Sequence, residues 1–131
     1  MSVDVIANFL TIIRNGVAAS KPFVIAPYSK MCADIAQILK QEGFIKDAAV
    51  LDEGVTSKKL KISLSYVGGE AVIHEITRAS TPGGRYYTGV KSIEPVIGGL
   101  GISILTTNRG VVSNKQAEKL GVGGEVICTV W

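Results

Sequence analysis

The stretch GISILTTNRG, residues 101–110, decides how the last quarter of the chain folds. Its first half is apolar, and the run stops abruptly at two threonines, an asparagine, an arginine and a glycine. This pattern predicts a buried strand that ends at Leu105, followed by a polar loop. A helix should then begin at Ser113, because Gln116 completes a capping box, and it should end at Gly121. The polar second half of the stretch is therefore predicted to be a rigid loop between a strand and a capped helix.

Proline and glycine mark the internal boundary of the chain. They cluster at 80–84 (Ser-Thr-Pro-Gly-Gly), and this composition is typical of a linker or turn. We therefore expect two domains, residues 1–79 and residues 80–131. Besides the strand and helix already described, the second domain should contain a short helical turn around 92–97 and a closing strand over 126–131.

Helical and alternating patterns fill the first domain. Apolar residues recur every three or four positions over 4–19, which predicts a helix with Asp4 at its positive end. Ser29 is a suitable N-cap for a second helix, and Gly43 is its stop signal. Strands are expected at 23–26, 44–51, 59–66 and 71–79, with turns at 52–54 and 68–69. The predicted fold class is α+β: two small α/β parts share one chain, the first α-β-α-β-β-β and the second β-rich with one short helix.

Composition narrows the class of protein. The 131 residues are 47% hydrophobic and 19% charged, so the chain can bury a sizeable core. No apolar run approaches the roughly 20 residues that span a bilayer, and the N-terminus lacks the features of a signal peptide. We expect a soluble intracellular protein without a membrane partner. Cys32 and Cys128 allow a disulfide on paper, but two buried thiols in a reducing compartment are the favoured interpretation.

The net charge of +3 is unevenly distributed. Residues 1–77 contain eight basic and eight acidic side chains, whereas residues 78–131 contain six basic and three acidic ones. The whole excess therefore lies in the last part of the chain. A polyanionic partner is expected to meet that part, although an excess this small is also compatible with an ordinary solvated surface.

The sequence does not favour catalysis, a metal or a cofactor. His74 is the only histidine, and neighbouring residues of a strand point to opposite faces, so Glu75 would not form a dyad with it. The two cysteines are far apart with no histidine nearby, which argues against zinc. The glycines at 98–101 precede a strand and are followed by no Walker lysine, which argues against a nucleotide loop. We expect a protein that is not an enzyme.

The loop after Leu105 fits another chemistry. Threonine and asparagine side chains can simply close a turn, and Gly110 supplies a permissive backbone position. As a set, however, short neutral donors and acceptors beside Arg109 suit the shallow minor groove of RNA, where they reach 2′-hydroxyls and base edges. The arginine would hold phosphate. The loop is therefore a candidate RNA-binding element.

Several blocks of the sequence resemble one family. The C-terminal blocks are GLGISILTTNRGVV (99–112), KQAEK (115–119) and GVGGEVICTVW (121–131). The earlier blocks are IANFLTIIRNG (6–16), Ser29-Lys30, QEGFI (41–45) and STPG (80–83) with Arg85 and Tyr87. In this order they are similar to the bacterial small-subunit ribosomal protein eight family, essentially from end to end.

That resemblance implies a two-part α/β protein that binds a helix in the central domain of the small-subunit ribosomal RNA and supports assembly of the subunit. It implies neighbouring ribosomal proteins as partners and, in some bacteria, binding to the mRNA of the protein's own operon. It places the protein in the cytoplasm on the ribosome, or in an organelle of bacterial descent. The RNA-binding residues that it implies are Thr106, Thr107, Asn108, Arg109, Gly110, Gly124, Glu125, Ser29, Lys30, Arg85 and Tyr87.

Some of these residues keep an alternative role. Thr106 and Asn108 stand where the family usually has serines, and the asparagine replaces a hydroxyl with a longer amide. Glu125 cannot pair with phosphate, so it should accept from a base amine or a 2′-hydroxyl, or else orient a neighbour. Tyr87 could equally be a half-buried strand aromatic. For the chain as a whole, the alternatives to a ribosomal protein are a translational regulator that uses the same RNA surface and a small α/β enzyme.

Overall fold

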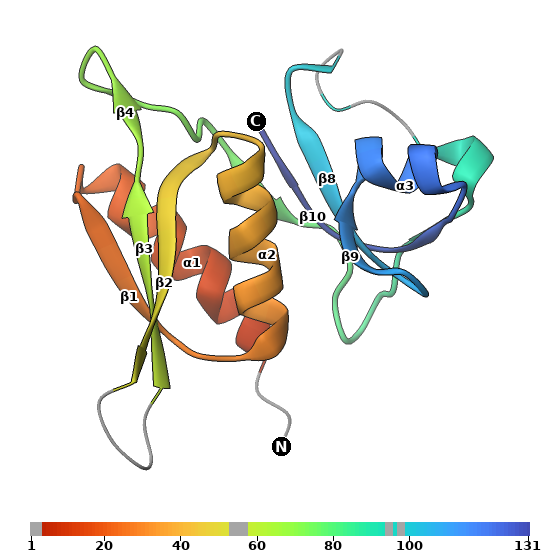
Figure 1. Ribbon diagram of the computed structural model, residues 1–131, viewed down its shortest axis with the longest axis horizontal. Helices are drawn as coiled ribbons and strands as arrows, with labels where there is room; N and C mark the ends of the chain where they lie inside the picture. The colour runs from red at the N-terminus through yellow and green to blue at the C-terminus, as the bar shows by residue number, and fades with distance from the viewer. Residues whose placement is uncertain (1–3, 53–57, 94–95, 97–98) are drawn as a thin grey trace. The chain divides into compact units, whose positions relative to one another are not determined.

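The computed structural model describes residues 4–52, 58–93, 96 and 99–131, which pack as two compact units, residues 1–74 and 75–131. The described residues form three α-helices and antiparallel sheets, so the predicted α+β class is confirmed (Figure 1). The boundary between 79 and 80 as a limit of separate domains stays a prediction. No helix in the described ranges is long and apolar enough to cross a membrane.

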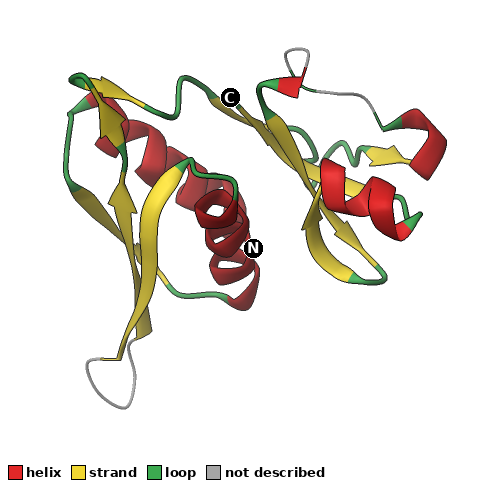
Figure 2. Ribbon diagram, turned by 45° about the horizontal axis from the view of Figure 1, so that its top comes forward, coloured by secondary structure: helices red, strands yellow, loops and turns green. Residues whose placement is uncertain are grey.

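The first unit is a three-stranded antiparallel sheet with two helices on one of its faces. Its strands lie in the order β1-β3-β2, and α1 and α2 pack along the same side (Figure 2). Phe9, Ile13, Ile35, Leu39 and Ile62 are among its fully buried side chains. A small hairpin of β4 and β5 follows. The elements are α1 (Val5–Ala18), β1 (Phe23–Pro27), α2 (Lys30–Gln41), β2 (Ile45–Asp52), β3 (Lys58–Leu64), β4 (Tyr66–Val67) and β5 (Glu70–Ala71).

Side-chain caps begin both helices: Ser29 caps α2 as predicted, and Asp4, predicted as the first residue of α1, is its N-cap. The Asp4 carboxylate accepts a hydrogen bond from the Ala7 amide at 3.0 Å, and the Ser29 hydroxyl accepts one from the Cys32 amide at 3.1 Å. These bonds satisfy amide groups that have no partner in the first helical turn. Gly43 has φ +82°, the left-handed conformation that ends a helix at low cost for glycine.

The second unit is a curved antiparallel sheet with one short helix. Its strands lie in the order β6-β10-β8-β9, and β7 also pairs with β10. Ser113 caps α3 by accepting from the Gln116 amide at 3.2 Å, and Gly121 ends the helix in the left-handed conformation, as predicted. The elements are β6 (Ile76–Arg78), β7 (Tyr87–Thr88), the 3-10 turn η1 (Val90–Ser92), β8 (Ile102–Thr107), β9 (Gly110–Ser113), α3 (Asn114–Leu120) and β10 (Gly124–Val130).

The predicted strand over 71–79 is wrong as a single element. It consists of β5 and β6, with a bend between them, because its two ends pair with different partners. The Val72 amide donates to the Ser65 carbonyl, whereas Glu75 exchanges two backbone hydrogen bonds with Trp131. His74 therefore lies in a bend with an exposed side chain and not in the middle of a strand.

The predicted polar loop after Leu105 is also shorter than expected. Thr106 and Thr107 continue β8 and pair with the first residues of β9, a strand that the sequence did not reveal. Only Asn108 and Arg109 remain in the turn. Threonine is β-branched and favours extended backbone, so the strand runs through both hydroxyl residues.

Three further predictions are affected in part. The predicted strand over 59–66 ends at Leu64, and Tyr66 begins β4. The helical turn expected around 92–97 appears at Val90–Ser92 as η1; residues 94–95 and 97–98 lie outside the described residues. The turn at 52–54 also falls largely outside them, between two strands that pair in antiparallel fashion.

Both cysteines are free and buried. Burial raises the pKa of the Cys128 thiol to about 12 and also raises that of Cys32, so the reactive thiolate is rare at neutral pH. We expect a thiol reagent such as Ellman's reagent to leave the native protein unmodified at pH 8 and to label two thiols per chain in denaturant. Rapid labelling of one thiol in the native protein would contradict this burial.

Candidate nucleic-acid interface

Three candidate residues that are distant in the sequence form one row across the second sheet. In β10, Glu125 lies directly opposite Tyr87 of β7 on one side and opposite Thr106 of β8 on the other. Directly opposed residues of antiparallel strands share a face, so the three side chains project from the same side of the sheet. Tyr87 is 68% exposed, which leaves its ring available to a partner.

The Glu125 carboxylate is already held by protein groups. One of its oxygens accepts hydrogen bonds from the Ser80 hydroxyl and from Arg85 Nη1, the latter at 2.9 Å. Ser80 is buried, and its hydroxyl also accepts from the Tyr86 amide at 3.1 Å, while its carbonyl accepts from Arg78 Nε. Of the two roles predicted for Glu125, this arrangement favours the orientation of a neighbouring group, namely the Arg85 guanidinium.

This network lowers the pKa of the Glu125 carboxyl below its ordinary value. The hydrogen bond from Ser80 is the largest cause, followed by the one from Arg85 and the positive charges of Arg85 and Arg78. A carboxyl whose pKa falls on folding stabilises the folded state at pH values above its unfolded pKa, and this contribution is lost as pH drops through the folded pKa.

We expect Glu125 to contribute to the acid sensitivity of the fold. As the pH is lowered from neutrality to below 4.5, the ordinary glutamate value, the wild-type Tm should fall more steeply than that of a Glu125→Gln variant. A series of thermal melts measures the difference. Glu118→Gln, at an exposed position on α3, is the matched control and should follow the wild type. Parallel curves for wild type and Glu125→Gln would contradict the coupling.

Side-chain hydrogen bonds of Thr107, one of two threonines in the hairpin, close the turn next to this row. The Thr107 hydroxyl donates to the Gly110 carbonyl at 2.9 Å and accepts from the Arg109 amide at 3.0 Å. Gly110 has φ +99°, a conformation that residues with side chains rarely adopt. By contrast, within the described part of the chain the Thr106 hydroxyl has no hydrogen-bond partner, and no carboxylate there pairs with the exposed Arg109 guanidinium.

Gly124 is needed for the close approach of strands beneath the row. A Cβ built on Gly124 would lie 2.1 Å from the Thr106 carbonyl oxygen, and one on Gly123 would lie 2.3 Å from the Thr88 carbonyl oxygen. Both obstacles are backbone atoms, which cannot rotate away. The two glycines thus let β10 fit tightly between β7 and β8, which keeps Tyr87, Glu125 and Thr106 in line.

Ser29 and Lys30 belong to the first unit, at the start of α2. The Ser29 hydroxyl caps this helix, so its acceptor is already in use. Lys30 pairs with Asp34 at 3.2 Å, but its side chain is 84% exposed and the pair is a surface one of small energetic value. Lys30 therefore stays accessible to an anion.

Sequence reasoning missed two residues of the site, Ser80 and Arg78. Ser80 appears in the sequence only as part of a turn motif, 45 positions before the carboxylate that it contacts. Arg78 ends β6, which the sequence showed only as part of a longer strand. No local pattern marks either residue, because the pairing of β6 with β10, and the segment that follows β6 along β10, bring them near Glu125.

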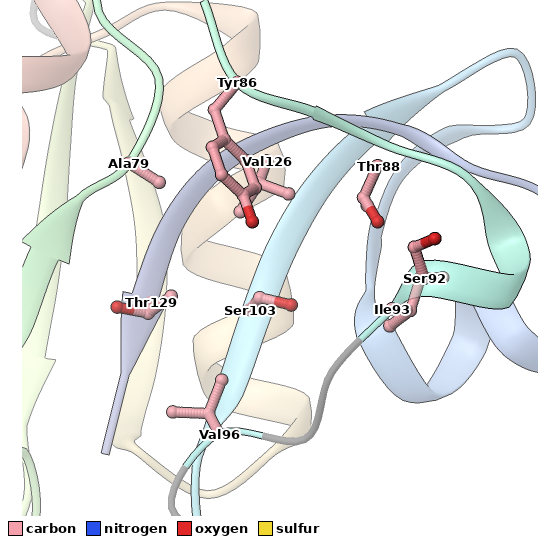
Figure 3. Close-up of a pocket in the computed structure, with 9 residues that line it drawn as sticks. All are labelled: Ala79, Tyr86, Thr88, Ser92, Ile93, Val96, Ser103, Val126 and Thr129. Carbon is pink, nitrogen blue, oxygen red and sulfur yellow. The ribbon is translucent and has the colours of Figure 1, made fainter.

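A pocket of about 190 Å³ lies in the second unit (Figure 3). Oxygen atoms of Tyr86, Thr88 and Ser103 point into the space that the lining residues surround, among the aliphatic side chains of Ile93, Val96 and Val126. Among its described lining residues only Tyr86 has a titratable side chain, so the pocket does not present a pair of groups for acid–base catalysis. Among the described residues, no group of three His, Cys, Asp or Glu side chains is placed to hold a metal ion.

Comparison with known proteins gives one consistent result over the whole chain. A family model described as Ribosomal protein S8 matches residues 4–131. The small ribosomal subunit protein uS8 of Solibacter usitatus is 47% identical over 132 residues, with 100% of both chains covered. Proteins of the same name from Gloeothece citriformis and Dictyoglomus thermophilum are 46% and 44% identical, and the matches cover 97% or more of each chain. The similarity runs through both units.

Proposed function

This chain belongs to the ribosomal protein S8 family, a family of structural, non-enzymatic components of the small ribosomal subunit, and from that premise we propose how it binds RNA. Its target is a helix in the central domain of the small-subunit ribosomal RNA. It supports assembly of the subunit there, beside neighbouring ribosomal proteins, on the cytoplasmic ribosome. The RNA meets the face of the second unit that carries Tyr87, Glu125 and Thr106.

The observation that carries this proposal is the row of Tyr87, Glu125 and Thr106. Arg85 and Arg109 lie beside this row. The free Thr106 hydroxyl can donate to or accept from a 2′-hydroxyl or a base edge, which the wide minor groove of RNA displays. The exposed Tyr87 ring offers a surface for a ribose or an unstacked base. Because Arg85 Nη1 donates to the Glu125 carboxylate at 2.9 Å, the Arg85 guanidinium is oriented next to this row.

The remaining candidate residues have supporting roles in this proposal. Arg109, at the tip of the hairpin, binds a phosphate, and Asn108 beside it reaches the sugar or a base edge. Gly110 and Gly124 maintain the backbone geometry of the hairpin and of the strands below it. Lys30, with Ser29 fixing the start of its helix, supplies a further phosphate contact from the first unit.

A salt series tests the proposal. We expect the wild type to bind a central-domain rRNA helix more tightly than an unrelated duplex of the same length, with an affinity that falls as salt rises. Arg109→Gln should weaken binding to both RNAs and reduce the salt slope by about one unit, because one phosphate contact is lost. Lys119→Gln, which removes an exposed charge from the last turn of α3, is the matched control. Equal affinity for the two RNAs would sink the proposal, and tighter binding to the operon mRNA would favour a regulator.

A further inference from the structure

The three-stranded sheet of the first unit has one face that its own helices do not cover. In β1, Val24 and Ala26 are buried under the helices, whereas Phe23 and Ile25 between them are each 42% exposed. Figures 1 and 2 show α1 and α2 on the same side of this sheet. Strand pairing defines the opposite side, here called the open sheet face, as three rows: Phe23–Ser63–Asp47, Ile25–Lys61–Ala49 and Pro27–Lys59–Leu51.

The charge of the open sheet face is concentrated on its central strand. Lys59 and Lys61 both project from β3, with apolar residues on either side of each. The single carboxylate among the nine residues is Asp47 at one corner, and it already pairs with Lys40 at 3.0 Å. The middle of the face therefore combines two cations with apolar surface, which complements a partner that carries both negative charge and flat apolar groups.

An aromatic ring and a lysine are already in contact on this face. The Lys61 ammonium lies 4.5 Å from the centroid of the Phe23 ring, within the range of a cation–π interaction. At this partly exposed position the contact is weak, so a bound partner can replace it with its own contacts to the ammonium and the ring. A nucleotide offers what each group lacks, because its phosphate can pair with the ammonium and its base can stack on the ring.

We propose that the open sheet face is a second RNA-binding surface, which takes an unpaired segment of the same rRNA beyond the helix bound by the second unit. Phosphates of this segment pair with Lys59 and Lys61, and one base stacks on Phe23. The inference rests on the proposed function for the identity of the partner as RNA. It concerns the other unit of the chain, and none of these three residues belongs to the set assigned above.

Binding to two RNAs is compared, so that failure of this inference can be distinguished from failure of the proposed function. The first is the central-domain helix alone, and the second is the same helix extended by the unpaired segments that adjoin it in the rRNA. The full-length wild type should bind the extended RNA more tightly and with a steeper salt slope. Lys59→Gln/Lys61→Gln should lower the slope on the extended RNA by about one to two units, since each single-strand phosphate contact accounts for roughly 0.7. Binding to the helix alone should not change.

The ring and the charges can be tested separately. Phe23→Leu keeps an apolar side chain at the exposed position and removes the stacking surface, so it should weaken binding to the extended RNA about tenfold at constant salt slope. A Lys115→Gln/Lys119→Gln variant removes the same number of exposed charges from α3, which is not part of the open sheet face, and should change binding to both RNAs by the same small amount. Thermal melts of all variants confirm that each is folded.

The outcomes are distinct. Failure of the wild type to bind the central-domain helix more tightly than an unrelated duplex would contradict the proposed function itself. Equal wild-type binding to the two RNAs, or sheet-face variants that bind the extended RNA like the wild type, would overturn the second surface and leave the proposed function intact. As a direct readout, acetylation followed by mass spectrometry should show Lys59 and Lys61 protected by the extended RNA and not by the helix alone. Protection of neither lysine would also overturn it.

Discussion

We expect a Gly124→Ala variant to lose about 1–3 kcal/mol of folding stability, or roughly 5–15 °C in Tm, and to bind rRNA more weakly than the stability loss explains. The added Cβ would lie 2.1 Å from the Thr106 carbonyl oxygen and 3.0 Å from Thr107 Cγ2. Since the nearer obstacle is backbone, β8 and β10 must move apart to accept the methyl group. That movement separates Thr106 from Glu125, which lies opposite it in the site.

Gly83→Ala is the matched control for this variant. A Cβ on Gly83 meets no atom within 4 Å, and its backbone does not adopt the left-handed conformation. The control should keep the wild-type Tm and the wild-type affinity. Thermal unfolding gives the first quantity, and RNA titration under conditions where both variants are folded gives the second. A Gly124→Ala variant with wild-type stability would show that the strands can separate at no cost.

The two threonines of the hairpin should respond differently to the same change. Thr106→Val removes a hydroxyl that has no partner among the described residues, so the fold should keep its stability while rRNA affinity falls about tenfold. Thr107→Val removes the hydroxyl that bonds to Gly110 and Arg109 and closes the turn. It should cost about 1 kcal/mol of stability, with affinity lowered only through the looser turn.

Valine keeps the β-branched shape of threonine, so both variants retain the extended backbone that β8 requires. Melts and RNA titrations on the same samples provide the comparison, and the two variants are controls for each other. Loss of stability in Thr106→Val would mean that its hydroxyl is a structural group. Unchanged affinity in Thr106→Val would mean that it does not contact RNA, and the row would then act only through Tyr87 and the arginines.

Site residues that lie in one stretch of sequence could be predicted, whereas contacts between residues distant in the sequence could not. The hairpin residues were identified from one contiguous stretch, but they were predicted to form a loop because β9 is too short to show a pattern of its own. The pairing of Thr106 with Glu125, and of Glu125 with Tyr87, follows from a register that no local pattern specifies. Ser80 was missed for the same reason, since a serine in a turn motif is ordinarily a turn residue.

The sequence by itself determined the helices, the caps at Ser29 and Ser113, the acidic residue Asp4 at the start of the first helix, and the α+β class. These depend on hydrogen bonds and apolar spacing within a few residues, which the order of side chains shows directly. Only the tertiary structure decided where the segment around His74 breaks and which side chains meet at Glu125. Both depend on which strands pair, because a strand joins the partner that completes its backbone hydrogen bonds and buries its apolar side, however distant that partner is in the chain.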